Sequence, residues 1–232
     1  MALIDENTVP GEGQLKDVPW LYFEDLHAKG LKILFVGNSI TRHRPKPEIG
    51  WYNHWGMAAS AKEKDYVHVT MDKVHELVPD AVHGLCQAGE WELHWPTGEE
   101  VLSRFEGVHA FDPDIILVRI VENCPRPVYE KELFMQQYDA LIRYLNPKGK
   151  AFVAVTTGFW EHPADEAIRQ VAQNRGYALC ELNDLGRDPA MKAIGLFEHK
   201  GVAAHPGDLG MAEIAKRVFE TIEPAVKAYL QK

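Results

Sequence analysis

The sequence has few cysteines, and they are far apart along the chain. Its three cysteines are Cys86, Cys124 and Cys180. An odd number without a CxxC pair excludes a disulfide scaffold, so we predict free thiols in a reducing compartment. Long apolar runs are scarce as well: the N-terminus has none of signal-peptide length, and no stretch reaches the roughly 18 residues of a membrane span. We therefore predict a cytoplasmic protein without a membrane-spanning segment.

Positive charge is also in short supply. The sequence has 25 Lys and Arg against 34 Asp and Glu, a formal net charge of −9. Nucleic acids and anionic lipid surfaces attract the opposite sign, so we expect neither nucleic acid nor a membrane as a partner. Eleven histidines are present, but no HExxH or HxH pattern accompanies them, and we predict no metal site.

What remains is an ordinary globular composition, 46% apolar and 10% aromatic, in a chain of 232 residues. Because the chain has no low-complexity linker and no internal repeat, we predict one α/β domain over residues 31–232. Residues 1–30 are polar and contain Pro and Gly, and we interpret them as an N-terminal arm. The WLYF segment at 20–23 is expected to lay a short apolar patch on the domain.

Short apolar runs alternate with segments of helical periodicity along the domain. The runs predict five buried strands at Leu31–Gly37, Ala81–Cys86, Asp114–Val121, Ala151–Thr157 and Tyr177–Cys180. The periodic segments predict helices at Trp55–Lys64, Tyr66–Leu77, Glu99–Val108, Tyr129–Leu145, Ala164–Arg175 and Gly210–Leu230. Such alternation is typical of a three-layer, doubly wound α/β domain, in which a parallel five-stranded sheet carries helices on both faces.

Residue types that carry chemistry follow the predicted strands. In an open parallel sheet, ligands bind beyond the carboxyl ends of the strands. Ser39 follows the first strand, Gly89 the second and Asn123 the third, while His205 precedes the last helix. We therefore predict that these four residues meet at one edge of the sheet.

Together the four residues can perform acyl transfer. An imidazole activates a serine hydroxyl by removing its proton, and the oxyanion that forms next needs hydrogen-bond donors already in place. We assign Ser39 as the nucleophile, with its own N–H as one donor, and His205 as the base. The Gly89 N–H, which no Cβ obstructs, and the Asn123 side-chain amide supply two further donors.

These residues resemble the four sequence blocks of the SGNH hydrolases, the superfamily of the GDSL esterases and lipases. ILFVGNSIT is similar to the nucleophile block, Gln-Ala-Gly at 87–89 to the glycine block, Glu-Asn at 122–123 to the asparagine block, and His205-Pro206 to the histidine block. The resemblance extends from Leu31 to the end of the chain. It implies a flavodoxin-like fold and hydrolysis of an ester, with no metal and no organic cofactor.

Three positions depart from the superfamily's pattern. Asn38 stands where the family usually has Asp, and the first residue of its Gly-x-Asn block is also replaced. The acid three residues before the histidine is replaced by Val202. Without that acid, we predict that a main-chain carbonyl or Glu198 orients His205. Asp208, the other nearby acid, is expected to cap the final helix.

Aromatic and basic side chains gather in the loops that follow the strands. The aromatic ones are Trp51, Tyr52, Trp55, Trp91, Trp95 and Trp160, and the basic ones are Arg42, His43, Arg44 and Lys46. Some of these aromatic rings must belong to the core, and the basic residues could form a solvated loop, but flat rings suit the faces of sugars and a cation suits a hydroxyl-rich or anionic group. We therefore predict an oligosaccharide or related small-molecule substrate that carries a short-chain, acetyl-like ester. The sequence is also compatible with a homo-oligomer.

Two other functions stay open. A protein of this fold whose hydrolytic machinery has decayed would bind carbohydrate without cleaving it, and the missing acid before His205 is consistent with that. A flavin or nucleotide binder is disfavoured, because the first turn has neither a GxGxxG motif nor a phosphate-loop lysine pattern.

Overall fold

A seven-stranded sheet forms the centre of the molecule. The structure is a computed structural model that describes residues 3–5, 21–23, 29–126 and 129–231. The strands are β1 (Leu3–Asp5), β2 (Leu21–Phe23), β3 (Lys32–Gly37), β4 (Val82–Gln87), β5 (Ile115–Arg119), β6 (Phe152–Thr156) and β7 (Ala178–Cys180). They lie in the order β1-β2-β4-β3-β5-β6-β7, and the five from β3 to β7 are parallel, which confirms the predicted sheet.

Part of the N-terminal arm extends this sheet beyond the five predicted strands. β2 pairs antiparallel with β4, with Leu21 opposite Cys86, and β1 pairs parallel with β2. The sequence predicted only an apolar patch for this segment, because three-residue strands are too short to show a period. Trp20, which belonged to the predicted patch, lies outside the described residues.

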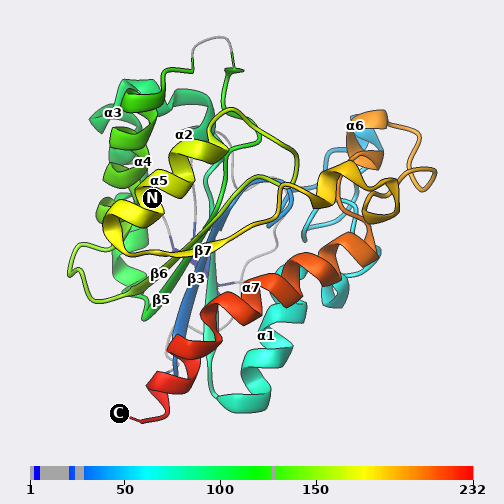
Figure 1. Ribbon diagram of the computed structural model, residues 1–232. Coiled ribbons are helices and arrows are strands. Elements are labelled where there is room, and N and C mark those ends of the chain that lie inside the picture. Colours follow the sequence, from blue (N-terminus) through cyan, green and yellow to red (C-terminus); the bar gives the residue numbers. More distant parts are fainter. Residues whose placement is uncertain (1–2, 6–20, 24–28, 127–128, 232) are drawn as a thin grey trace.

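Helices cover both faces of the sheet (Figure 1). The helices α1 (Tyr66–Leu77) and α7 (Asp208–Tyr229) pack on one face, and α2 (Gly89–His94), α3 (Glu99–Leu102), α4 (Lys131–Leu145) and α5 (Asp165–Arg175) pack on the other. In β3, Ile33 and Phe35 join the core of the first face, whereas Leu34 and Val36 join that of the second. Burial on both faces is the reason why the strands are continuous apolar runs.

Most predicted helices are confirmed to within a few residues, but two segments differ. The predicted helix at Glu99–Val108 is divided into α3 and a 3-10 helix at Ser103–Phe111. The predicted helix Trp55–Lys64 is wrong, because the segment is irregular apart from a 3-10 helix at Lys62–Lys64. Ala58 there has a φ of 75°, and a Cβ on Gly56 would lie 2.4 Å from the Ile40 carbonyl oxygen. A positive φ at a residue other than glycine is not compatible with a regular helix, and the close approach at Gly56 shows that this segment packs tightly against the turn after β3.

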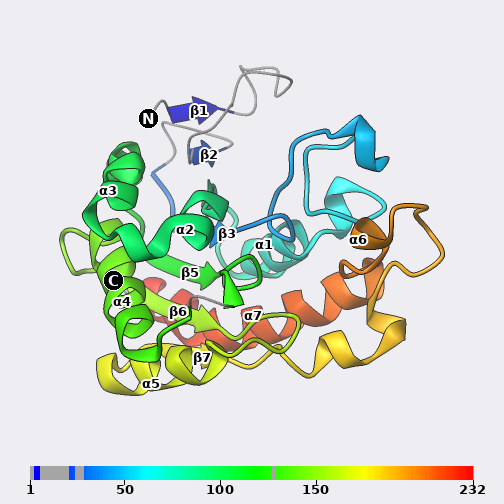
Figure 2. The same cartoon turned by 90° about the horizontal axis from the view of Figure 1, so that it is seen from above.

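The parallel strands bring their carboxyl ends to one edge of the molecule. In Figure 2 the arrows of β5 and β6 point to the side on which the short helix α6 (Lys200–Ala203) lies. The residues after β3, β4 and β5 are therefore on the same side as the segment that carries His205. This is the edge at which the sequence predicted the site.

Candidate active site

Ser39 lies in a tight turn directly after β3. The Thr41 and Arg42 N–H groups both donate to the Asn38 carbonyl oxygen at 3.0 Å, and the Met57 N–H donates to the Ser39 carbonyl oxygen at 2.8 Å. No α-helix follows this turn directly, since the next one begins at Tyr66. The turn is held by backbone hydrogen bonds and by the irregular segment that carries Met57.

Close approach explains the glycine before this turn. A Cβ on Gly37 would lie 1.7 Å from the Thr41 side-chain oxygen. That oxygen is 2.7 Å from the Tyr66 hydroxyl at the start of α1. Only glycine therefore lets the chain fold back so tightly after β3.

His205 lies against Ser39, as the sequence predicted. The Ser39 Oγ is 2.8 Å from the His205 Nε2, and the His205 Nδ1 is 2.7 Å from the Gly201 carbonyl oxygen. A carbonyl only accepts hydrogen bonds, so Nδ1 carries the proton and donates to Gly201. The Nε2 lone pair is then free to accept the Ser39 hydroxyl proton, which is the arrangement that a general base requires.

The surroundings of His205 keep its ring neutral. Its pKa is lowered to about 4: burial is the largest cause, the nearby His43 acts in the same direction, and the hydrogen bond to Gly201 opposes them. The Trp160 ring packs edge-on against the imidazole, with 5.5 Å between the ring centroids. At neutral pH His205 is therefore able to take up a proton.

Of the two predicted ways to orient His205, the structure has the main-chain carbonyl. Glu198 is exposed, whereas the Nδ1 donates to Gly201 in α6. Val202 is fully buried and packs with Trp51. The position that carries an acid in the SGNH pattern is thus a core position in this chain.

Asp208 has a different role from the predicted helix cap. It is the first residue of α7, and its carboxylate accepts hydrogen bonds from the Ser60 N–H at 2.8 Å and the Ser60 hydroxyl at 2.7 Å. Lys64 also contacts it at 2.8 Å. Asp208 therefore ties the irregular segment after β3 to α7 rather than capping its own helix.

The two remaining predicted donors both have partners. The Gly89 N–H donates to the Gln87 Oε1 at 2.6 Å, so it is occupied as long as Gln87 keeps this conformation. Asn123 is exposed, and its Nδ2 donates one hydrogen to the Glu92 Oε2 at 2.6 Å. An amide nitrogen has two hydrogens, so Asn123 keeps one for a ligand.

A buried polar cluster beneath the turn was not predicted. Arg119 is fully buried in β5 and donates to the Glu122 Oε1 at 2.6 Å and to the Asn38 Oδ1. The Asn38 Nδ2 donates to the Glu122 Oε2 at 2.6 Å and to the Glu92 Oε1 at 2.9 Å. Burial alone would raise the pKa of Glu122, but the Arg119 guanidinium and the donors around the carboxylate outweigh it and lower that pKa.

The sequence held one signal for this cluster. Arg119 interrupts an apolar strand. Because the sheet is covered on both faces, this cation is buried, and a buried cation requires an anion close to it. Glu122, three residues on, was the obvious partner. Glu92 gave no comparable signal, because nothing in the sequence shows that α2 folds over the end of β5.

Only some of the aromatic side chains that were expected near the substrate are exposed. Trp51, Trp91 and Trp95 are fully buried and belong to the core, so their predicted role in sugar binding is wrong. Tyr52 is 66% exposed, and Trp160 is half-buried beside His205. Trp91 lies in α2 and Trp95 in a 3-10 helix at Trp95–Thr97, and both pack on the sheet, whereas Trp51 packs in a smaller core cluster with Val202.

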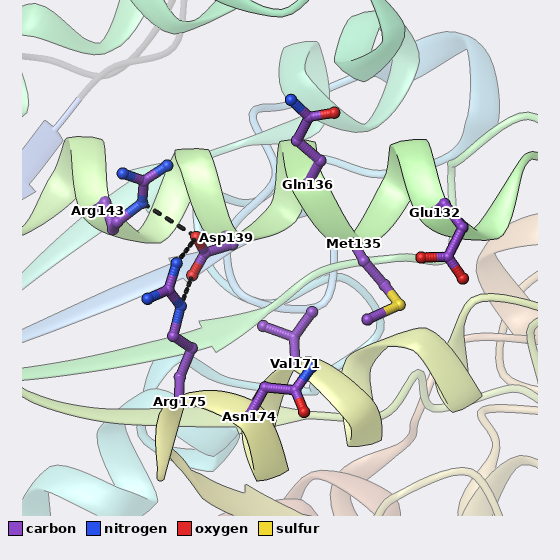
Figure 3. A pocket seen from close by; sticks show the side chains of 8 residues that line it. All are labelled: Glu132, Met135, Gln136, Asp139, Arg143, Val171, Asn174 and Arg175. Atoms are coloured by element: carbon purple, nitrogen blue, oxygen red, sulfur yellow. Dashed lines mark hydrogen bonds and ion pairs between the residues drawn. The ribbon is translucent and has the colours of Figure 1, made fainter.

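A pocket of about 550 Å³ lies elsewhere, between α4 and α5 (Figure 3). Asp139 there accepts hydrogen bonds from the Arg143 Nε at 3.0 Å and the Arg175 Nε at 2.7 Å. The Asp139 carboxylate is thus paired with both arginines of this pocket, and none of the predicted catalytic residues lines it.

The described residues offer little support for other site types. The three cysteines are free and buried, and burial raises the pKa of the Cys180 thiol to about 11. Within the described ranges, no three His, Cys, Asp or Glu side chains are grouped so that they could hold a metal ion. In the same part of the chain, no helix is both long and apolar enough to cross a bilayer.

Comparison with solved structures places this geometry in a known fold. No protein-family model and no curated protein sequence matches the chain. A two-domain esterase active on acetylated mannans has a TM-score of 0.58 and 20% identity, over 85% of this chain and 50% of that one. A family two carbohydrate esterase from Cellvibrio japonicus has a TM-score of 0.58 and 17% identity, over 86% and 62%. TesA has a TM-score of 0.55 and 15% identity, over 84% and 99%.

The chain has the SGNH hydrolase fold. It spans about half the length of the mannan esterase and nearly all of TesA. The order of its parallel strands, β4-β3-β5-β6-β7, is the flavodoxin-like order that the resemblance implied.

The structure explains one departure from the SGNH pattern, the asparagine at position 38. Asn38 takes the usual place of Asp, and it lies against two buried carboxylates, those of Glu92 and Glu122. An Asp at this position would add a third negative charge to the cluster. The amide instead donates to both carboxylates and accepts from Arg119.

Proposed function

We propose that this protein is a serine esterase that removes a short acyl group from a carbohydrate or a related small molecule. The observation that carries the proposal is the 2.8 Å contact between the Ser39 Oγ and the His205 Nε2, with the Nδ1 proton engaged by Gly201. This contact puts a proton acceptor beside a hydroxyl at the carboxyl edge of the sheet.

In the proposed reaction, Ser39 donates its proton to His205 while Oγ attacks the ester carbonyl. The oxyanion is stabilised by the Ser39 N–H and by the free hydrogen of the Asn123 amide, and Gly89 contributes if Gln87 turns away. His205 then gives the proton to the departing alcohol. Water hydrolyses the acyl-enzyme with His205 again as the base.

A carbonyl partner suits this cycle less well than a carboxylate does. The Gly201 oxygen fixes the tautomer of His205, but it carries only a partial charge against the imidazolium that forms. We therefore expect a working Ser-His pair with a weaker electrostatic contribution than that of a full triad.

The substrate class rests on the surroundings of the site and on the neighbours of the fold. Trp160 is half-buried and lies beside His205, so aromatic surface is available next to the proposed catalytic pair. Two of the solved structures with this fold are named as esterases of carbohydrates. Both observations support an acylated sugar, and the small acetyl group is the acyl part that we propose.

The test compares the wild-type protein with Ser39→Ala. We expect the wild type to release acetate from p-nitrophenyl acetate and acetylated oligosaccharides and to react with a fluorophosphonate probe. We expect Ser39→Ala to do neither, because the nucleophilic oxygen is gone. Exposed Ser103→Ala is the control that retains both. Undiminished turnover by Ser39→Ala would refute the mechanism, and binding of acetylated sugars without turnover by the wild type would favour a carbohydrate-binding protein.

A further inference from the structure

Glu92 is a fully buried carboxylate that contacts two parts of the proposed site at once. It lies in α2, and its Oε1 accepts hydrogen bonds from the Asn38 Nδ2 at 2.9 Å and the Val121 N–H at 2.7 Å. The Asn123 N–H also reaches Oε1, at 3.3 Å, and the Asn123 Nδ2 donates to Oε2 at 2.6 Å. One side chain thus connects the ends of β3 and β5.

These contacts bear on the residues that would act on substrate. Asn38 immediately precedes the nucleophile Ser39, and Asn123 is the proposed donor to the oxyanion. A carboxylate that holds both fixes the spacing between the nucleophile turn and the donor before substrate binds. Pre-organised donors of this kind are the most effective, because nothing has to reorient during the reaction.

The charge on Glu92 also determines which way the Asn123 amide faces. An ionised carboxylate only accepts hydrogen bonds, so it holds the NH₂ end of the amide towards Oε2. A protonated carboxyl, or a glutamine, has hydrogen of its own to place there. The Asn123 amide would then turn its oxygen towards Glu92, and the donor to substrate would be lost.

We propose that ionised Glu92 is a positioning residue for this site: it aligns the Ser39 turn with Asn123 and keeps the second hydrogen of the Asn123 side-chain amide pointing at the oxyanion. This inference rests on the proposed esterase function. It assigns Glu92 no direct contact with substrate.

The groups around Glu92 make its charge sensitive to pH. Burial and then the negative charge of Glu122 raise the pKa of Glu92 to about 7, while its hydrogen bonds from Asn123, Asn38 and Val121 act in the opposite direction. Arg119, which faces the same cluster from β5, is bound to Glu122. The neutral thiol of Cys124 also lies close to Glu92.

The wild-type pH profile therefore has a specific expected form. Activity falls as the pH drops through about 7, where Glu92 takes up a proton. His205, with its pKa near 4, would by itself allow activity at much lower pH. Acetate release is the suitable readout, because the absorbance of nitrophenol itself changes with pH.

The decisive variant is Glu92→Gln, which keeps the size and removes the charge. We expect kcat to fall about 10²-fold with little change in KM, as for loss of an oxyanion donor, and the remaining activity to lose its dependence near pH 7. Glu90→Gln is the matched control on the same helix: Glu90 pairs with Arg104 at 2.7 Å, and we expect wild-type kinetics. Glu92→Asp retains the charge and is expected to recover part of kcat and the pH dependence.

The outcomes separate this inference from the proposed function. An inactive wild type that ignores the fluorophosphonate probe would refute the esterase function itself. An active wild type whose acid limb lies near pH 4, or a Glu92→Gln variant with wild-type kcat and pH profile, would refute the role of Glu92 alone. If Glu92→Gln does not fold, the wild-type profile and Glu92→Asp still decide the question.

Discussion

At the residue scale, the side-chain amide of Asn38 forms hydrogen bonds with three charged groups at once. Its two hydrogens go to Glu92 and Glu122, and its oxygen accepts from Arg119. The residue is 1% exposed, so each of these groups would lose a buried hydrogen bond if the amide were lost. Asparagine at this position is thus required by the cluster beneath it.

We predict that Asn38→Asp destabilises the protein by about 3 kcal/mol, because a third carboxylate would lie against two others around one guanidinium. Repulsion raises the folded-state pKa of such a carboxyl, so the loss grows as the pH rises and is larger at pH 8 than at pH 5. Urea unfolding at both pH values measures it. Exposed Asn174→Asp on α5 is the control, and an equal effect of both variants would contradict the prediction.

The sequence motif identified the proposed nucleophile and base, but not the group that orients the base. Ser39 and His205 were recognised because nucleophile and base each have a characteristic sequence context. The partner of the His205 Nδ1 was left open between Glu198 and a backbone carbonyl. No sequence pattern marks a particular carbonyl such as that of Gly201, since every residue has one.

At the scale of elements, the irregular segment between β3 and α1 supports the nucleophile turn. Asp65 caps α1 by accepting from the His68 N–H at 2.9 Å, and it also accepts from the Gly56 N–H at 3.1 Å. The neighbouring Met57 N–H donates to the Ser39 carbonyl oxygen. A single buried carboxylate therefore joins the start of a helix to the loop behind Ser39.

We predict that Asp65→Ala costs about 2 kcal/mol or more, from the lost cap and the unpaired Gly56 N–H, and that it also lowers activity. Asp65→Asn is expected to recover only part of the stability, because its single side-chain oxygen can cap α1 at the His68 N–H while its NH₂ group would face the Gly56 N–H. Thermal unfolding and acetate release measure the two effects. The prediction fails if Asp65→Asn is as impaired as Asp65→Ala.

The same segment marks the limit of prediction from periodicity. The apolar residues at 55–64 have a spacing that resembles a helix, but their burial follows from contacts with Ser39 and α7 and not from one helical face. By contrast, α1 was predicted with its observed bounds, because its apolar residues lie on one stripe that α7 covers.

At the scale of the whole molecule, a buried charge needed for activity is expected to reduce stability. Glu92 has a folded-state pKa of about 7, above that of an unfolded glutamate, so the folded protein holds a proton that the unfolded chain has released. Its contribution to stability is present at low pH and is lost as the pH rises through about 7. Such an opposition between activity and stability is common at functional sites.

We predict that the unfolding free energy of the wild type, relative to that of Glu92→Gln, falls on the order of 2 kcal/mol between pH 5 and pH 8. Glutamine does not titrate, so the difference between the two proteins reports the titration of Glu92 and cancels that of groups that do not interact with it. Urea unfolding of both proteins at the two pH values gives the result. A difference that stays constant or increases with pH would contradict it.

The sequence by itself determined the layers of this protein and the two residues of its proposed proton transfer. Apolar runs identify β3, β5 and β6 because a strand covered on both faces must be apolar throughout, and their order with the helices specifies a parallel sheet. The tertiary structure decided how polar groups are paired: Asn38 with Glu92, 54 residues apart, and His205 with a carbonyl. Periodicity records whether a side chain faces the core, but only packing brings distant donors and acceptors within 3 Å of one another.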